Sequence, residues 1–210
     1  MKKKLNKKNI LLIGLPILIF IIVIIGIIIL LSKDNNENKI SNPDGERFKE
    51  EYEVLNNTKN EEGKVYPEVS ISSSNIIKYS TETEILNIIN NNGDAVVYFG
   101  YPTCGYCRSS VEVLLNTSKD TKLDVIYYID TNKIELSDEL QNILKESIIE
   151  DSYSSLVVFI TDGEIVSYNI DTLSSHEDPY KKLYPSQVEG LSEIYKYGIN
   201  DVVSSKEIKK

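Results

Sequence analysis

The hydrophobic and polar positions between residues 69 and 203 follow two periods, one typical of buried strands and the other of amphipathic helices. Short runs rich in β-branched and aromatic residues predict strands over residues 75–79, 94–100, 123–129, 156–160 and 165–170. Apolar residues at three- and four-residue spacing predict helices over residues 81–90, 104–116, 137–150 and 187–203. Strands that alternate with helices favour parallel β-α-β units, so we expect an α/β fold with a central sheet flanked by helices.

Local signals refine these elements. Thr81 followed by Glu84 has the spacing of a capping box, so the helix after it should begin there. The pair Asp162-Gly163 predicts a hairpin that adds an antiparallel edge strand and makes the sheet mixed. An earlier segment, residues 46–57, has Phe48 and Tyr52 on one helical stripe and predicts a short helix packed on the domain.

The N-terminal part of the chain has a different pattern. Residues 10–31 are almost uninterrupted in their apolar character, which is long enough to cross a bilayer and longer than the core of a signal peptide. Five of the first eight residues are lysine, so residues 1–9 are expected to form a cytoplasmic basic tail. We therefore predict a single-pass membrane protein whose remaining residues lie outside the cytoplasm, in an oxidising compartment.

Composition, length and charge indicate how the remaining residues are organised and which partners are excluded. Residues 32–45 are rich in Asn, Asp and Lys, include a Pro-Asp-Gly turn signal, and are expected to form a flexible linker. Residues 46–210 have the length of one ordinary domain. The formal net charge of −9 and the lack of a basic stripe in this part argue against a nucleic-acid partner.

Cys104 and Cys107 are the only cysteines, and they lie directly after a predicted strand and at the start of a predicted helix. A Cys-x-x-Cys pair in this place is typical of a redox dithiol. We expect the N–H groups of the helix start to lower the pKa of Cys104 and make it the nucleophile, with nearby positive charge from Arg108. Cys107 is then expected to be the more buried, resolving thiol.

Two other uses of the pair were weighed. A zinc site needs four ligands, and the chain has no third cysteine and a single histidine, His176, in a distant polar loop. A purely structural disulfide closing so short a loop would constrain the unfolded chain little. Redox use without a metal or organic cofactor is therefore the favoured interpretation. His176 itself is expected to be exposed rather than catalytic.

The motifs around the dithiol carry a family resemblance. Residues 98–108, 127–130 and 159–163, with residues 48–53 and 178–180, resemble the membrane- or lipid-anchored thioredoxin-like proteins of low-GC Gram-positive bacteria, which include bacteriocin-transport accessory proteins. The resemblance implies a thioredoxin-like fold over roughly residues 46–210, with Cys104 attacking and Cys107 resolving. Thr103 before the Cys-Gly-Tyr-Cys motif is also similar to periplasmic disulfide isomerases, and we count Thr103 with Arg108 among the residues that tune the nucleophile.

The chain departs from this family at two positions. Ser155, preceded by Ser154, stands where most thioredoxin-like proteins have a cis-proline, so a trans or shifted loop is expected there. One hypothesis gives Ser155 a hydroxyl near Cys104, and the alternative is an ordinary loop serine. Tyr98 stands where thioredoxin has a buried aspartate; we expect it to fill core, because tyrosine is a poor base at neutral pH. Asp94, at the start of the same strand, is expected to be solvated.

The surface around the dithiol suggests polypeptide partners. Tyr101, Pro102 and Tyr106 surround the pair, and with Ser154 and Ser155 they are predicted to face substrate. The favoured function is a membrane-tethered thiol–disulfide oxidoreductase that acts on protein thiols and disulfides and has a membrane redox protein or transporter as a possible partner. A non-catalytic accessory module of a transport or secretion system remains open, as does a reductant for cytochrome c assembly.

Overall fold

The computed structural model describes residues 42–148, 155–169, 173 and 175–209. The predicted membrane span, residues 10–31, lies outside these residues, as do the basic tail 1–9 and residues 32–41 of the linker. No helix within the described ranges has the length and apolar character needed to cross a bilayer. The fold described below is that of the unit that begins at Asn42.

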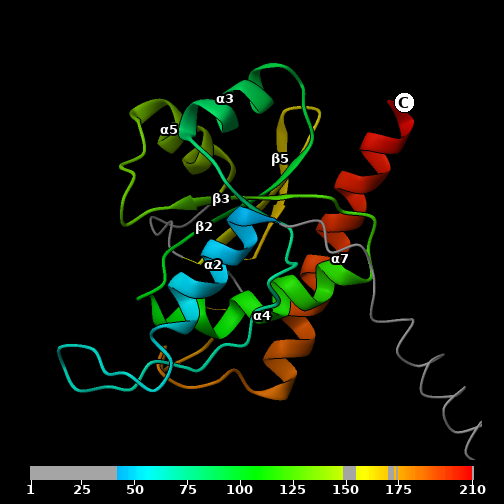
Figure 1. The fold of residues 1–210 in the computed structure, drawn as a ribbon. Helices are drawn as coiled ribbons and strands as arrows, with labels where there is room; N and C mark the ends of the chain where they lie inside the picture. Colours follow the sequence, from blue (N-terminus) through cyan, green and yellow to red (C-terminus); the bar gives the residue numbers. More distant parts are fainter. Residues whose placement is uncertain (1–41, 149–154, 170–172, 174, 210) are drawn as a thin grey trace, which may run out of the picture. The chain divides into compact units, whose positions relative to one another are not determined.

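The centre of this unit is a mixed sheet of five strands in the order β1-β3-β2-β4-β5 (Figure 1). The strands are β1 (Ile77–Tyr79), β2 (Ala95–Gly100), β3 (Ile126–Asp130), β4 (Leu156–Thr161) and β5 (Glu164–Tyr168). Strands β1, β3 and β2 are parallel, whereas β4 is antiparallel to both β2 and β5. The expected mixed α/β sheet is confirmed, but the antiparallel part begins one strand earlier than the hairpin alone predicts.

Helices cover both faces of the sheet: α2 (Pro43–Glu53), α3 (Glu82–Asn90), α4 (Gly105–Lys119), α5 (Asp138–Ser147) and α7 (Pro185–Ile208). In Figure 1, α3 and α5 lie together on one side of the sheet, and α2, α4 and α7 on the other. Residues of β2 alternate between the two cores: Val96 and Tyr98 pack with α2, α4 and α7, and Val97 and Phe99 pack with α3 and α5. This alternation is the period of a strand that is buried on both faces.

Several element boundaries differ from the sequence expectations. Helix α2 begins at Pro43, not residue 46, so the Pro-Asp-Gly segment forms its first turn instead of a linker turn. Proline suits the first turn because its missing N–H would have no partner inside the helix. Helix α7 starts at Pro185 and runs to Ile208, five residues beyond the predicted end. The cap at Thr81 is confirmed, since its side chain accepts the N–H of Glu84 at 3.3 Å.

Asp94, expected to be solvated, is partly buried, and its side chain is only 4 % exposed. It accepts hydrogen bonds from Lys209 Nζ at 2.8 Å, from the Asp162 N–H at 3.0 Å and from Ser205 Oγ at 2.8 Å. The expectation failed because the end of α7 and the β4–β5 hairpin both close over the start of β2. The carboxylate therefore ties three distant parts of the chain together.

Candidate active site

The two cysteines lie where the sequence places them, at the start of α4. Strand β2 ends at Gly100, and Cys104 is the N-cap of the helix, with the extended backbone (φ −76°, ψ 119°) that a cap requires. The Cys107 N–H donates to Cys104 Sγ at 3.1 Å. A hydrogen bond from a helix N–H favours a charged acceptor, so the backbone at this place supports a thiolate on Cys104.

Burial separates the two thiols. Cys104 is 6 % exposed and Cys107 is fully buried. Burial raises the pKa of Cys107 well above its usual value, and the hydrogen bond to Cys104 and the charge of that residue raise it further. Cys107 therefore keeps its proton to higher pH, and the more accessible Cys104 is the better placed of the two to react first.

Tyr98 fills core as predicted, and its hydroxyl also lies in a specific position. The Tyr98 and Tyr52 hydroxyl oxygens are 3.1 Å apart in the buried core. A Cβ at Gly100 would lie 2.7 Å from the Tyr98 hydroxyl, so glycine leaves the space that this group occupies. Burial raises the pKa of the Cys107 thiol, and Tyr98 in the same core cluster lowers it by less. Tyr98 and Tyr52 cannot act as bases, because burial raises the pKa of both well above the usual value.

Arg108 is buried, and its guanidinium group lies among backbone carbonyls. It donates to Tyr52 O at 2.7 Å, to Pro67 O at 2.8 Å and to Pro102 O at 3.3 Å, and also to Asn56 Oδ1 at 2.7 Å. These bonds join α4 to the end of α2 and to the loop that precedes Cys104. Its predicted electrostatic effect on the nucleophile stays a prediction, as does that of Thr103, which is exposed beside Cys104.

Residues 176–183, called the covering loop below, pack against the start of α4. A Cβ at Gly105 would lie 2.5 Å from the Pro179 carbonyl, so only glycine allows this close approach. The Ser109 hydroxyl lies 3.0 Å from the Lys181 carbonyl. Tyr101 is partly buried, and its pKa is raised by burial first and then by Cys104, Cys107 and Tyr180. The dithiol thus lies in the cluster that Tyr101 packs against, and beside a loop that the sequence analysis had not placed there. Residues 178–180 of this loop belong to the family resemblance.

His176 is buried at 3 % exposure, so the expected exposed position is wrong. Its Nε2 donates to the Lys181 carbonyl at 2.9 Å, which closes the covering loop on itself. Its ring lies edge-on to that of Tyr106, with centroids 6.1 Å apart, and the Tyr106 hydroxyl donates to the His176 carbonyl at 3.1 Å. Through these two contacts with His176, Tyr106 anchors the covering loop as well as bordering the dithiol.

Ser155, which was predicted to face substrate, is buried instead. It is 2 % exposed, and its φ of 62° is in the left-handed region. Its hydroxyl lies 2.9 Å from that of Ser110 in α4, and its carbonyl accepts the Asn169 amide at 3.0 Å. The residue is therefore a link between β4 and α4, which explains why a substrate-facing assignment fails. Ser154 lies outside the described residues.

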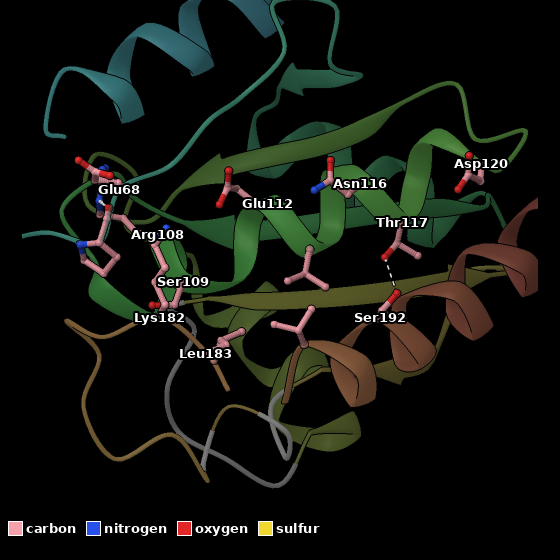
Figure 2. Close-up of a pocket in the computed structure, with 13 residues that line it drawn as sticks. Glu68, Arg108, Ser109, Glu112, Asn116, Thr117, Asp120, Lys182, Leu183 and Ser192 are labelled. Atoms are coloured by element: carbon pink, nitrogen blue, oxygen red, sulfur yellow. Dashed lines mark hydrogen bonds between the residues drawn. The ribbon is translucent and has the colours of Figure 1, made fainter. Parts of the chain in front are cut away.

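A cavity of about 420 Å³ lies beside α4 (Figure 2). Glu68, Glu112 and Asp120 supply carboxylates along one side, and Val113, Leu183 and Val188 supply apolar surface. The Thr117 and Ser192 hydroxyls, 3.0 Å apart, bridge α4 and α7 at the cavity, and Ser109 marks the end nearer the dithiol. This surface was not identified from the sequence, because its residues come from separate elements.

Comparison with known proteins adds little to this geometry. No protein-family model matches the chain, and no curated protein sequence does either. Among solved structures, reduced desulfothioredoxin from Desulfovibrio vulgaris Hildenborough is similar, with 17 % identity over 54 % of this chain and 88 % of that one, at a TM-score of 0.32. The class of the domain therefore rests on its own topology: a mixed five-stranded sheet with a Cys-x-x-Cys pair at the start of the helix after β2, which is a thioredoxin-like arrangement.

Proposed function

We propose that this protein is a thiol–disulfide oxidoreductase that acts on the thiols and disulfides of other proteins. The observation that carries the proposal is the asymmetry of the dithiol. Cys104 caps α4 and accepts the Cys107 N–H at 3.1 Å, while Cys107 is fully buried behind it. A nucleophilic sulfur at a helix start with a resolving thiol one turn later is the arrangement that disulfide exchange requires.

The reaction needs only these two sulfurs. The Cys104 thiolate attacks one sulfur of a substrate disulfide, forms a mixed disulfide, and releases the other substrate sulfur as a thiolate that takes a proton from water. Cys107 then attacks Cys104 Sγ, the bond to the substrate breaks, and the second substrate sulfur leaves with the electron pair and a proton. The substrate disulfide is reduced to two thiols and the Cys104–Cys107 pair is oxidised. The same steps in reverse oxidise a dithiol.

The location and partners belong to the same proposal. Residues 10–31 would anchor the chain in the cell membrane, with residues 1–9 in the cytoplasm and the dithiol outside. The sequence resemblance to anchored thioredoxin-like proteins of low-GC Gram-positive bacteria supports this arrangement. A membrane redox protein or a transporter would then be the partner that exchanges electrons or delivers substrate.

A non-catalytic accessory module is the second candidate. It is favoured by the 6 % exposure of Cys104 and by the covering loop packed on Gly105, which leave little of the nucleophile open to a protein substrate. In that case the cavity beside α4 would be the binding surface, and the dithiol would have a structural role.

Equilibration of the full-length chain with glutathione or dithiothreitol buffers separates the two candidates. An oxidoreductase should show a single two-electron transition at a potential within the range of thioredoxin-fold proteins, roughly −270 to −120 mV. Cys107→Ser should then trap mixed disulfides on Cys104 in membranes of the source cells, and Cys104→Ser is the matched control that should trap none. A dithiol that does not exchange with either buffer would reject the enzyme and favour the accessory module.

A further inference from the structure

The cavity beside α4 follows the face of the helix at whose start the nucleophile lies. The residues of α4 that line it form two rows at four-residue spacing: Arg108, Glu112, Asn116 and Asp120, and next to them Ser109, Val113 and Thr117. Residues four apart lie on the same face of an α-helix. Four residues before the first members of these rows come Cys104 and Gly105, so the cavity extends from the dithiol along α4.

The two sides of the cavity differ in chemistry (Figure 2). Glu112 and Asp120 lie on one side of α4, and Leu183 of the covering loop lies on the other, where Val188 of α7 also lines the cavity. Val188 and Tyr184, one turn apart at the start of α7, are 38 % and 64 % exposed. An apolar surface that is open to solvent therefore faces the carboxylate side.

The carboxylates of the cavity have no cation beside them. Among the described residues, Glu68, Glu112 and Asp120 form no ion pair with a lysine or arginine side chain. Glu112 is oriented instead by the Ser70 N–H, which donates to its Oε1 at 2.7 Å. These carboxylates are therefore available to a cation that comes from outside the described chain.

Two cationic residues also line the cavity, but they do not neutralise this side. Arg108 is 1 % exposed, and its guanidinium group donates to backbone carbonyls inside the fold. Lys182 lies beside Ser109, at the end nearer the dithiol (Figure 2). Over the stretch from Glu112 to Asp120, about 12 Å along the helix axis, the charged side chains that line the cavity are carboxylates. Its volume of about 420 Å³ is in the range of ligand-binding sites.

We propose that this cavity binds an extended segment of the protein substrate in which a cationic side chain lies next to an apolar one. Successive side chains of an extended chain point to opposite sides. One side chain can therefore reach Glu112 or Asp120 while the next packs on Leu183 and Val188. The inference rests on the proposed oxidoreductase function and adds the class of substrate, which is a cationic polypeptide. The formal net charge of −9 favours the same class of partner.

The length of the segment follows from the position of the cavity. Ser109, at the near end, is five residues from Cys104, roughly 7 Å along the helix axis. An extended chain rises about 3.3 Å per residue, so the third residue from the substrate cysteine would enter the cavity. The residues between would cross the covering loop, whose Lys182 and Leu183 already line the cavity. The cationic side chain is then expected farther along, beyond Lys182.

Short peptides with one activated cysteine test the proposal on the reduced full-length chain in a non-ionic detergent. The cysteine carries thionitrobenzoate in a disulfide bond; the Cys104 thiolate attacks the peptide sulfur, and coloured thionitrobenzoate leaves with the electron pair. One peptide has alternating leucine and lysine on both sides of the cysteine, and the other has leucine and glutamate. Each rate is divided by that of dithiothreitol with the same peptide. We expect about a tenfold preference for the lysine peptide, which should fall as salt is added.

Variants of the cavity locate the preference. Glu112→Gln combined with Asp120→Asn should lower it about fivefold, and the new glutamine keeps an oxygen that can accept the Ser70 N–H. The matched control, Glu139→Gln combined with Glu146→Gln, changes net charge equally at two exposed carboxylates of α5, on the other face of the sheet, and should keep the preference.

The apolar side has its own variant. Val188→Ser should slow the reaction of both peptides about threefold, because both carry leucine. Val188 is partly exposed, so the fold should tolerate the change. If this variant leaves both rates unchanged, the segment does not lie in the cavity and the inference fails.

The remaining outcomes separate this inference from the proposed function. An equal fall in the preference with the α5 variant would overturn the inference, because the effect would then come from net charge and not from the cavity. Equal rates of the wild-type chain with the two peptides would also overturn it, although the oxidoreductase proposal stands. If the reduced chain reacts with neither peptide, the oxidoreductase proposal itself fails, and the inference with it.

Discussion

Arg108 donates a hydrogen bond from Nη1 to the Tyr52 carbonyl at 2.7 Å and so joins the dithiol helix α4 to the end of α2, 56 residues earlier in the chain. The same nitrogen lies 3.3 Å from the Pro102 carbonyl in the loop before Cys104. The carbonyls at the end of a helix carry partial negative charge, so a buried cation is well placed there. Helix α2 is therefore connected to the dithiol by a specific polar contact as well as by its apolar face.

Replacement of Arg108 by alanine should destabilise the fold. It leaves buried carbonyls at Tyr52 and Pro67 without their donor, and we expect a loss of about 3 kcal/mol in the free energy of unfolding. Arg108→Lys should recover only part of this, because an ammonium cannot reach several acceptors in one plane. Urea unfolding provides the measurement. Arg47→Ala removes an exposed arginine and serves as the control, with a change below about 1 kcal/mol; an equal loss in both variants would contradict the assigned role.

Gly100→Ala should disturb the Tyr98 hydroxyl, because the new Cβ would lie 2.7 Å from it. We expect a loss of about 1–3 kcal/mol in the free energy of unfolding, as is typical of overpacking. Tyr98→Phe removes the hydroxyl that the methyl group would meet. The two substitutions should therefore be less than additive in a double-mutant cycle measured by urea unfolding. Additive losses would mean that the new Cβ is crowded mainly by the ring carbons of Tyr98, at 2.8 and 3.0 Å, and not by its hydroxyl.

Much of the fold could be predicted from period and composition. The all-buried run of β2 and the cap at Thr81 are local signals, and they are found as expected. The direction of β4 could not be predicted in the same way, because an apolar run does not indicate whether a strand is parallel or antiparallel to its neighbours. Which neighbour it pairs with, and in which direction, depends on where the connection through α5 brings the chain back to the sheet.

At the site, the sequence pattern placed the two cysteines correctly, but it did not predict the contacts of the residues around them. Arg108 binds mainly backbone carbonyls, which any residue can supply, so no motif marks its partners. His176 is buried because its ring lies between Tyr106 and the Lys181 carbonyl, a contact that exists only after the covering loop has folded back. Tyr98 could be singled out by its position in the motif, whereas its partner Tyr52 was predicted only as a packing residue of a separate helix.

Gly105→Ala should open the covering loop. Its Cβ would lie 2.5 Å from the Pro179 carbonyl, and because that atom is backbone, the loop has to move away. We expect Cys104 to react with iodoacetamide severalfold faster, since burial limits its access in the wild-type chain. Gly198→Ala is a control with similar crowding, against the Phe159 ring, at a site outside the loop. If both variants change the alkylation rate equally, the effect reports general loosening and not movement of the covering loop.

Asp94 should contribute stability that depends on pH. Burial raises its pKa, but hydrogen bonds from Lys209, the Asp162 N–H and Ser205 outweigh this and hold the pKa below its usual value. A carboxyl with a lowered folded pKa stabilises the fold above its unfolded pKa, about 3.9, and this contribution is lost as pH falls through the folded value. Asp94→Asn should therefore cost about 1–2 kcal/mol at neutral pH and nothing in strong acid. Urea unfolding at several pH values measures this, and Asp124→Asn, which alters an exposed carboxylate, should show no such dependence.

Cys107 should make the stability of the reduced protein depend on pH in the opposite way, so that stability is lost in alkali. Burial raises its pKa well above that of an unfolded cysteine, so the folded state holds the proton after the unfolded chain has released it. That difference stabilises the fold fully below the unfolded pKa, about 8.5, and is lost as pH rises further, by about 1.4 kcal/mol per pH unit. Reduced wild-type protein should lose stability on this slope relative to Cys107→Ala between about pH 8.5 and 10, below the range in which the buried tyrosines titrate. Urea unfolding under reducing conditions measures the difference, and the oxidised wild-type protein, which has no thiol to titrate, is the control. Parallel stability curves for reduced wild type and Cys107→Ala would mean that the folded protein releases the Cys107 proton as readily as the unfolded chain does.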